Sequence, residues 1–240
     1  MKIIIIRHGE PYNEKNTLTE KGFIEVKALS EFLKNQKMDK VYSSPLERAK
    51  LTAEAVLKPL NREAIILPWL EEFTHKVTVP YSEERVMNWD FLPNYFVNNK
   101  DLYDNEKYLK TDVMKSASIE THHQEVVTAF DKLLEENGYK REGYCYRVNR
   151  ENRDVIVLFC HLGMMSVLAG HLLNIPYVLM AQGFAPAPSS ITTFVSEERQ
   201  EGIAQFRCLG YGDISHLNIK NLKPSVHGRF CEIFHSDERH

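Results

Sequence analysis

Residues 1–22, MKIIIIRHGEPYNEKNTLTEKG, are the stretch of this chain that decides its fold. The isoleucines at positions 3–6 form a continuous β-branched run, which is typical of a strand buried on both faces of a parallel sheet. The run passes directly into Arg7 and His8, and ligands of open α/β sheets bind beyond the carboxyl ends of the strands. We therefore predict a central strand over residues 2–6 that holds these two side chains at a ligand site, where Gly9 allows close backbone approach.

The chain continues as alternating strands and helices. Apolar runs and helical periodicity predict a helix at 18–35 capped by Thr19, a strand at 40–43, a helix that starts at Ser44 and Pro45, a strand at 64–67, a helix at 118–137, a strand at 154–160 with a helix behind it, and strands at 190–196 and 203–209. Residues 140–153 are polar and predict irregular structure. The alternation predicts an α/β fold, a three-layer α/β/α sandwich with a mostly parallel central sheet.

Residues 74–115 do not continue this alternation of strands and helices. They scatter aromatic residues among polar ones, namely Tyr81, Trp89, Phe91, Tyr95, Phe96, Tyr103 and Tyr108. We predict one domain over residues 1–240, into which 74–115 is inserted as a cap. The segment either roofs a site as a lid or packs as a satellite core, and the pattern leaves both open. A roof of aromatic rings would favour a substrate with an apolar or ring-bearing part.

The composition excludes several classes of protein. The 240 residues are 43% hydrophobic and 26% charged with a net charge of -3, an ordinary globular balance without the basic excess of a nucleic-acid-binding protein. The apolar runs are too short for a signal peptide or a membrane span. The cysteines, at positions 145, 160, 208 and 231, form no CxxC pair, so neither a zinc site nor a disulfide framework is expected. We expect a cytoplasmic protein with reduced thiols.

A parallel sheet would gather reactive side chains from four strand ends at one crevice: Arg7 and His8 after the first strand, Arg48 after the second, Glu71 and Glu72 after the third, and His161 after residues 154–160. Arginine forks suit phosphate oxygens better than lysines do. A histidine between two guanidiniums has a lowered pKa, so its neutral imidazole is a usable nucleophile at physiological pH. A carboxylic acid near an anionic substrate has a raised pKa and can protonate a leaving oxygen. The set predicts phosphoryl transfer through a histidine, with no metal and no cofactor.

Several short motifs share their order and spacing with a known family. They are IRHGE at 6–10, LTEKG at 18–22, SSPLERAKLTAE at 43–54, LEEF at 70–73 and a strand that ends in His161. In this order the chain resembles branch 1 of the histidine phosphatase superfamily, the phosphoglycerate mutase-like family. The resemblance covers most of the chain outside the insertion.

The resemblance implies a role for each matching residue. His8 matches the nucleophile that becomes phosphohistidine. Arg7 and Arg48 match the arginines that bind phosphate. His161 matches the second histidine, which binds phosphate and stabilises the transition state.

Three further positions follow from the resemblance less directly. The acid glutamate of the family usually lies two places after the leucine of LEEF, which selects Glu72 over Glu71. Asn13 matches an asparagine that often follows RHG and contacts phosphate, although the loop is one residue shorter here. The family usually has glycine directly after the second histidine, whereas this chain has Leu162 and then Gly163. We interpret that departure as a subfamily feature that reshapes the pocket wall.

Other polar residues have ordinary structural interpretations. Cys160 stands beside His161, but successive strand residues face opposite ways, so we interpret it as a buried strand cysteine. His122 and His123 are adjacent on a helix and point away from a shared site, so we interpret them as solvated surface. Residues 210–217, GYGDISHL, are interpreted as a turn with a cap.

The leading functional hypothesis is a phosphomonoesterase that hydrolyses a small-molecule phosphate ester, with no nucleic-acid or membrane partner. A cofactor-dependent phosphoglycerate mutase shares such a site, but the basic residues of 74–115 are few and scattered, which disfavours it. A non-catalytic phospholigand-binding protein is the third hypothesis, and the intact set of site residues argues against it. The sequence does not choose among sugar phosphates, nucleotides, cofactor precursors and phosphoproteins as substrate, and it leaves a homodimer open.

Overall fold

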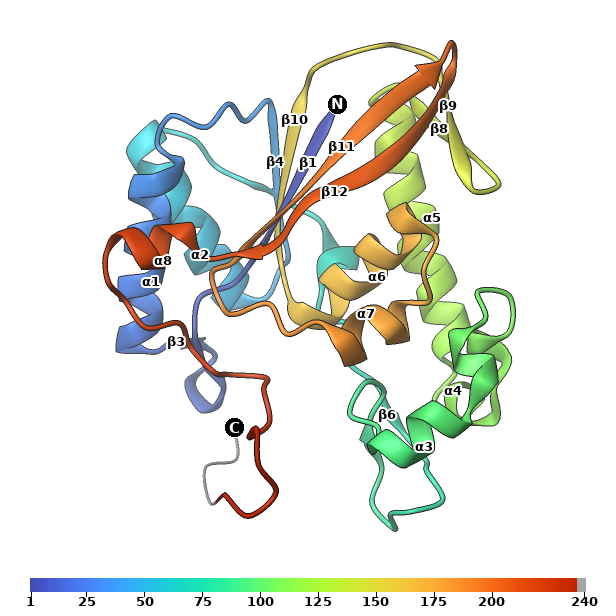
Figure 1. Cartoon of the computed structure of the whole chain (residues 1–240). Coiled ribbons are helices and arrows are strands. Elements are labelled where there is room, and N and C mark those ends of the chain that lie inside the picture. The colour runs from blue at the N-terminus through green and yellow to red at the C-terminus, as the bar shows by residue number, and fades with distance from the viewer. Residues whose placement is uncertain (237–240) are drawn as a thin grey trace.

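A computed structural model describes residues 1–236 of the chain and is built around one large sheet (Figure 1). In the described residues this sheet has eight strands in the order β5-β4-β10-β1-β11-β12-β9-β8. The strands are β1 (Lys2–Arg7), β4 (Lys40–Ser43), β5 (Ile65–Ile66), β8 (Tyr139–Glu142), β9 (Cys145–Val148), β10 (Val155–Cys160), β11 (Ile191–Gln200) and β12 (Ile203–Asp213). A small hairpin of β2 (Pro11–Tyr12) and β3 (Thr17–Leu18) follows β1.

The sheet is parallel in its first half and antiparallel in its second. β5, β4, β10 and β1 pair in parallel, and β1 pairs with β10 so that Arg7 lies opposite Cys160. From β1 onward the pairings with β11, β12, β9 and β8 are antiparallel. The prediction of a mostly parallel sheet is therefore confirmed for the core that holds β1, and the hairpin-connected strands add the antiparallel half.

The predicted irregular structure at 140–153 is wrong over much of its length. β8 and β9 form a hairpin that turns at Gly143, whose φ of +58° favours glycine. This hairpin is the edge of the sheet, and only Tyr139 and Tyr146 are buried in it. An edge strand that buries so few side chains has no apolar alternation for a sequence pattern to detect.

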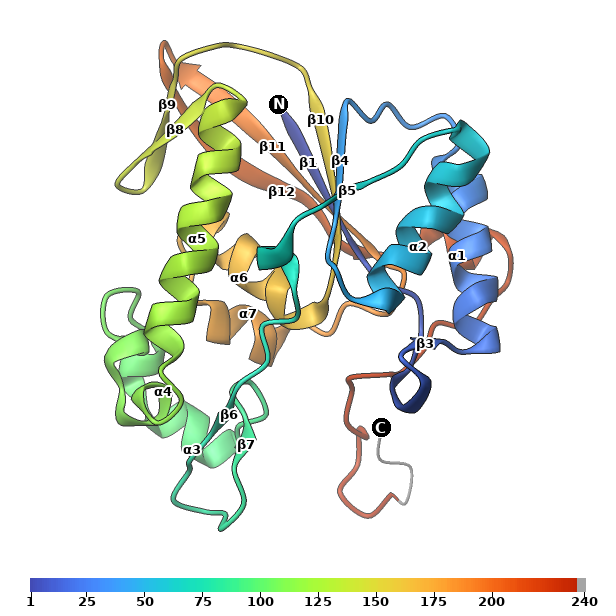
Figure 2. The same ribbon diagram turned by 180° about the vertical axis from the view of Figure 1, so that it is seen from behind.

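Helices cover both faces of the sheet (Figures 1 and 2). One face carries α1 (Glu20–Leu33), α2 (Glu47–Leu57) and α8 (Ser215–Ile219), and the other carries α5 (Ile119–Glu136), α6 (Leu162–Leu173) and α7 (Tyr177–Gly183). Ile4 and Ile6 pack in a core with the first set, and Ile3 and Ile5 pack in a core with the second. β1 is thus buried on both faces, which confirms the predicted three-layer sandwich.

Local contacts explain where the first two helices begin. Thr19 caps α1, because its Oγ1 accepts a hydrogen bond of 2.9 Å from the Gly22 N–H. A Cβ at Gly22 would lie 2.3 Å from the Glu10 carbonyl oxygen, so the LTEKG motif needs glycine here. α2 begins at Glu47, later than the predicted start at Ser44 and Pro45. The Ser44 hydroxyl instead accepts a bond from the Leu46 N–H, in the turn before the helix.

The inserted residues 74–115 form short elements beside α5 and α7 (Figure 1). These are β6 (Lys76–Val77), β7 (Val86–Met87), α3 (Pro93–Asn98) and α4 (Asp112–Lys115), joined by 3-10 turns. Phe91, Phe96 and Tyr108 belong to the same core cluster as the residues of α5 to α7. The insertion therefore packs on the main domain, and its service as a lid stays a prediction.

The packing of this cap overturns one interpretation. His122 and His123 are not solvated surface, since both rings are partly buried. His122 Nδ1 lies 2.8 Å from His75 Nε2, and His123 Nε2 lies 3.0 Å from the Tyr108 hydroxyl. The reason is that the cap covers this side of α5, which the pattern of the helix alone does not show.

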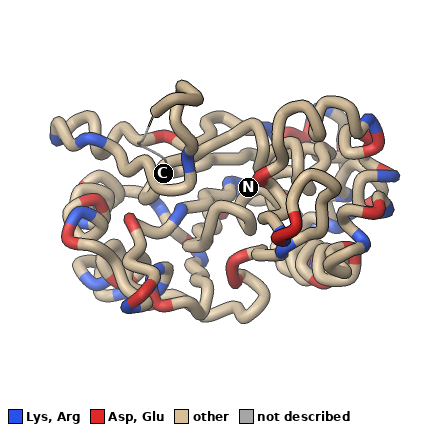
Figure 3. Tube along the Cα trace, turned by 90° about the horizontal axis from the view of Figure 1, so that it is seen from below, with Lys and Arg blue, Asp and Glu red and all other residues tan. Residues whose placement is uncertain are grey.

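The distribution of charged residues and the apolar character of the helices can also be described. Lysine and arginine alternate with aspartate and glutamate around the periphery of the molecule (Figure 3). Within residues 1–236, none of the helices combines the length and the apolar character that crossing a bilayer requires.

Candidate active site

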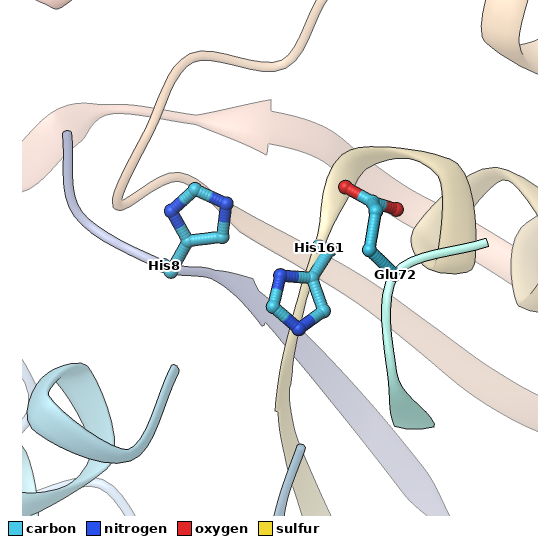
Figure 4. A group of neighbouring side chains, drawn as sticks. All are labelled: His8, Glu72 and His161. Carbon is cyan, nitrogen blue, oxygen red and sulfur yellow. The ribbon is translucent and has the colours of Figure 1, made fainter. Parts of the chain in front are cut away.

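Two histidines and a glutamate meet at the carboxyl edge of the parallel strands (Figure 4). His8 follows β1, His161 follows β10 and Glu72 lies in the loop after β5. The ring centroids of His8 and His161 are 5.1 Å apart, and one nitrogen or oxygen atom from each of the three residues lies within 4.8 Å of the others. Neighbouring parallel strands end side by side, so the fold brings together residues that are more than 60 positions apart in the sequence.

His8 is oriented and kept neutral by its surroundings. It is buried, and its Nδ1 lies 2.7 Å from the Gly9 carbonyl oxygen. A carbonyl only accepts, so Nδ1 carries the proton and Nε2 keeps a free lone pair. Burial, and then the charge of Arg7, hold the pKa of His8 well below its ordinary value. The residue therefore has the protonation state of a nucleophile at neutral pH.

His161 is the second buried imidazole. Its Nε2 lies 2.7 Å from the Ser44 hydroxyl, and its Nδ1 has no partner within the described chain. Burial, followed by the charges of Arg48 and Arg7, holds the pKa of His161 well below its ordinary value. The sequence predicts only a helix start at Ser44, yet in the structure its hydroxyl positions this ring. The unpartnered Nδ1 is a polar atom that a bound ligand can satisfy.

Two arginines make the site electropositive. Arg7 is buried, and its Nη1 donates to the Pro186 carbonyl at 2.6 Å and to the His227 carbonyl at 3.3 Å. Burial lowers the pKa of Arg7 to about 10, which leaves it charged at neutral pH. Arg48, in the first turn of α2, is half-buried, and burial lowers its pKa as well. Two partly desolvated guanidiniums beside two neutral imidazoles favour an anionic ligand with several oxygens.

Glu72 is held by backbone groups. Its Oε1 accepts hydrogen bonds from the N–H groups of Phe73 at 3.0 Å, Gly163 at 2.9 Å and Met164 at 3.2 Å. Burial raises the pKa of this carboxyl, while Arg7 and Arg48 oppose the rise. Three donors on one oxygen leave Oε2 as the place for a proton that can be transferred. Glu71, in contrast, is exposed, so the structure places Glu72 in the cluster and Glu71 outside it.

Asn13 lies apart from this group. It is exposed at the start of the 3-10 turn Asn13–Lys15, between β2 and β3. Its side chain makes no hydrogen bond within residues 1–236, and its assignment as a phosphate ligand stays a prediction.

The three atoms that face one another at His8, Glu72 and His161 also have the spacing of a metal-binding group. The charge around them points to an anion instead. Arg7 and Arg48 both lower the pKa values of the two imidazoles, and the same positive potential repels a cation.

Residues 210–217, GYGDISHL, contribute a histidine that contacts His8 indirectly, through Ser189. His216 is buried, and its Nε2 lies 2.9 Å from the Ser189 hydroxyl. The Ser189 N–H in turn donates to the His8 carbonyl at 2.9 Å. The predicted turn is wrong, because residues 210–213 continue strand β12, and the predicted cap is reduced to a bond of 2.8 Å that Asp213 accepts from the Ser215 N–H just before α8. The motif thus has a positioning role that reasoning from the sequence missed.

The C-terminal segment also reaches the site, although no pattern in its residues predicts this. Lys21 Nζ donates to the Pro224 carbonyl at 3.2 Å, and the chain then passes Arg7 at residues 227 and 228. A Cβ at Gly228, whose φ is +87°, would lie 3.3 Å from Arg7 Nη2 and 3.6 Å from Leu162 Cδ2. The segment therefore covers the Arg7 side of the crevice.

Comparison with known proteins places this site in a family. Residues 3–208 match the model of the histidine phosphatase superfamily, branch 1. The chain is 37% identical over 83 residues to an adenosylcobalamin/alpha-ribazole phosphatase of Salmonella typhi, a match that spans 30% of this chain and only 40% of the length of that protein.

Solved structures share the fold. Phosphoserine phosphatase of Entamoeba histolytica, in complex with 3-phosphoglyceric acid, superposes with a TM-score of 0.59 at 20% identity, over 90% of this chain and 98% of that one. A mycobacterial glucosyl-3-phosphoglycerate phosphatase superposes with a TM-score of 0.56 at 16% identity, over 88% of this chain and 98% of that one. The chain belongs to branch 1 of the histidine phosphatase superfamily.

Proposed function

We propose that this protein is a phosphomonoesterase that hydrolyses a small-molecule phosphate ester through a phosphohistidine on His8, without a metal or a cofactor. The observation that carries the proposal is the neutral His8 imidazole, whose Nδ1 is tied to the Gly9 carbonyl, beside two arginines and a protonatable glutamate. The relatives named above are phosphatases, which supports the reaction class and leaves the substrate open.

The first step transfers the phosphoryl group to the enzyme. Arg7, Arg48 and His161 hold the phosphate oxygens, and Asn13 is proposed to join them from its loop. The lone pair of His8 Nε2 attacks phosphorus in line while the bond from phosphorus to the ester oxygen breaks. Glu72 gives its proton to that oxygen, so a neutral alcohol leaves and a carboxylate remains. The Gly9 carbonyl stabilises the positive charge that develops on the His8 ring.

The second step returns the enzyme to its starting state. Glu72, now a carboxylate, takes a proton from a water molecule while the water oxygen attacks phosphorus. The bond between His8 Nε2 and phosphorus breaks, the electron pair returns to Nε2 and inorganic phosphate leaves. Glu72 ends protonated and His8 neutral, so atoms and charge balance over the cycle.

We also propose a cytoplasmic location and leave open a homodimer. The location is supported by the four cysteines, all of which have free thiols in residues 1–236.

Phosphate release from a panel of phosphomonoesters at pH 5 to 7.5, with EDTA present, tests the proposal. We expect turnover of a few esters by the wild type, none by His8→Ala, and an acid-labile phosphoryl adduct on His8 after rapid quenching. Wild-type turnover that survives in His8→Ala would refute the mechanism. Tight phosphate binding without turnover of any ester would indicate a binding protein, and dependence on 2,3-bisphosphoglycerate would indicate a mutase.

A further inference from the structure

Trp89 of the cap touches the residue that holds the proposed acid. A Cβ built on Gly163 would lie 2.5 Å from Trp89 Cζ3, 2.7 Å from Trp89 Cη2 and 2.9 Å from Glu72 Oε1. The six-membered ring of the indole and the Glu72 carboxylate therefore adjoin the same point at the start of α6. Gly163 also donates its N–H to Glu72 at 2.9 Å, so the three groups form one wall of the crevice.

The position of Trp89 is fixed by the residue before it. Asn88 is fully buried, its Nδ2 donates to the Tyr177 hydroxyl at 2.8 Å, and its N–H donates to the His75 carbonyl at 3.0 Å. Trp89 itself is only partly buried, and within the described chain it stacks on no other aromatic ring. A held aromatic ring with part of its surface open at a site wall is a platform for a ligand.

The position of the proposed acid places the leaving group next to the Trp89 ring. The ester oxygen must lie at Glu72, because this residue supplies its proton. On the Arg7 side the crevice is covered by Gly228 and Leu162. The part of the substrate beyond the ester oxygen therefore extends along the wall that Glu72 shares with Trp89.

Charges near Trp89 narrow the class of leaving group. The next residue is Asp90, which is half-buried, and its acidic side chain would disfavour a second anionic group placed beside the indole. The nearest arginine along the cap, Arg85, already donates to the Ser116 carbonyl. A flat, uncharged ring suits this wall, because it can stack on the indole, adds no second negative charge near Asp90 and needs no cation to bind it.

We propose that Trp89 determines specificity by stacking on the leaving group, and that the substrates are phosphomonoesters whose alcohol carries a planar, uncharged ring. This inference rests on the proposed phosphatase function, because it takes the phosphate position and the role of Glu72 from it.

Binding of two phosphonates that cannot be hydrolysed separates the two proposals. Phenylphosphonate carries a ring and methylphosphonate does not, so the ratio of their Kd values isolates the ring. We expect Trp89→Ala to raise the Kd of phenylphosphonate roughly threefold to tenfold, which is the range of an aromatic pair. The same variant should change the Kd of methylphosphonate by less than about twofold. Trp89→Phe should retain most of the preference. Tyr103→Leu is the matched control, because that ring is in the cap but packs on Phe96.

Fluorescence gives a second readout that does not depend on turnover. The chain has two tryptophans, so Trp69→Phe leaves Trp89 as the single source of tryptophan emission. Phenylphosphonate should shift or quench this emission, and methylphosphonate should do so much less. An unchanged ratio of Kd values in Trp89→Ala would overturn the stacking proposal while the phosphatase proposal stands. Failure of both phosphonates to bind the wild type would overturn the proposed function and, with it, this inference.

Discussion

Replacing Glu72 by glutamine should remove the proton donor and leave the fold intact. Glutamine has nearly the same shape, and its side-chain oxygen can accept the same three N–H groups, from Phe73, Gly163 and Met164. The free energy of unfolding should therefore change by no more than about 1 kcal/mol. The amide cannot give up a proton to a leaving alcohol, so the effect should fall on the chemical step.

The magnitude depends on how much the leaving group needs protonation. General acid catalysis contributes about 10²- to 10⁴-fold, or roughly 3 to 5 kcal/mol of transition-state stabilisation. An alkyl phosphate has a strongly basic leaving oxygen, so Glu72→Gln should lose kcat over this whole range. Nitrophenolate leaves well without a proton, so the loss for p-nitrophenyl phosphate should be at least about tenfold smaller.

The neighbouring glutamate supplies a matched control. Glu71 is exposed, and Glu71→Gln should keep kcat for both esters within about twofold of the wild type. The assay is steady-state phosphate release on both substrates, with thermal melting to confirm that each variant is folded. Equal losses for the two esters, or a larger loss in Glu71→Gln, would refute the assignment of Glu72 as the acid.

Three further predictions concern pH and packing. The lowered pKa of His8 and the raised pKa of Glu72 should keep kcat/KM high on the acidic side of neutrality, with a fall as pH rises and Glu72 ionises; a fall that persists in Glu72→Gln would contradict this. Burial raises the pKa of Glu25 to about 7, above its ordinary 4.5, so the folded state keeps a proton that the unfolded state loses between these pH values. Up to about 3 kcal/mol of the stability present below pH 4.5 should therefore be lost as pH rises toward 7. Thermal melts from pH 4.5 to 8 should show this loss in the wild type and little of it in Glu25→Gln. Gly163→Ala should cost roughly 1 to 3 kcal/mol and lower kcat at least tenfold, because the new methyl group would meet Trp89 at 2.5 Å and Glu72 at 2.9 Å; a melting temperature and kcat equal to those of the wild type would show that the wall is not built this way.

The sequence by itself determined the parts of the protein that depend on neighbours along the chain. The isoleucine run predicted a strand buried on both faces, and the structure confirms it with Ile4 and Ile6 in one core and Ile3 and Ile5 in the other. Thr19 was predicted as a cap because capping needs only a hydroxyl three residues before an N–H. The ends of parallel strands meet at one edge, so the expectation of a parallel sheet was enough to predict that His8, His161 and Glu72 lie together.

Only the tertiary structure decided which polar residues lie at the site and which aromatic ring adjoins it. Ser44 reads as a helix start, yet its hydroxyl orients His161, and His216 supports His8 through Ser189. The wall of Trp89 against Gly163 joins residues 74 positions apart. No periodicity records such contacts, because a polar or aromatic side chain in an irregular segment packs where the folded core places it. The proposed choice of substrate rests on these contacts, so it depends on the tertiary structure.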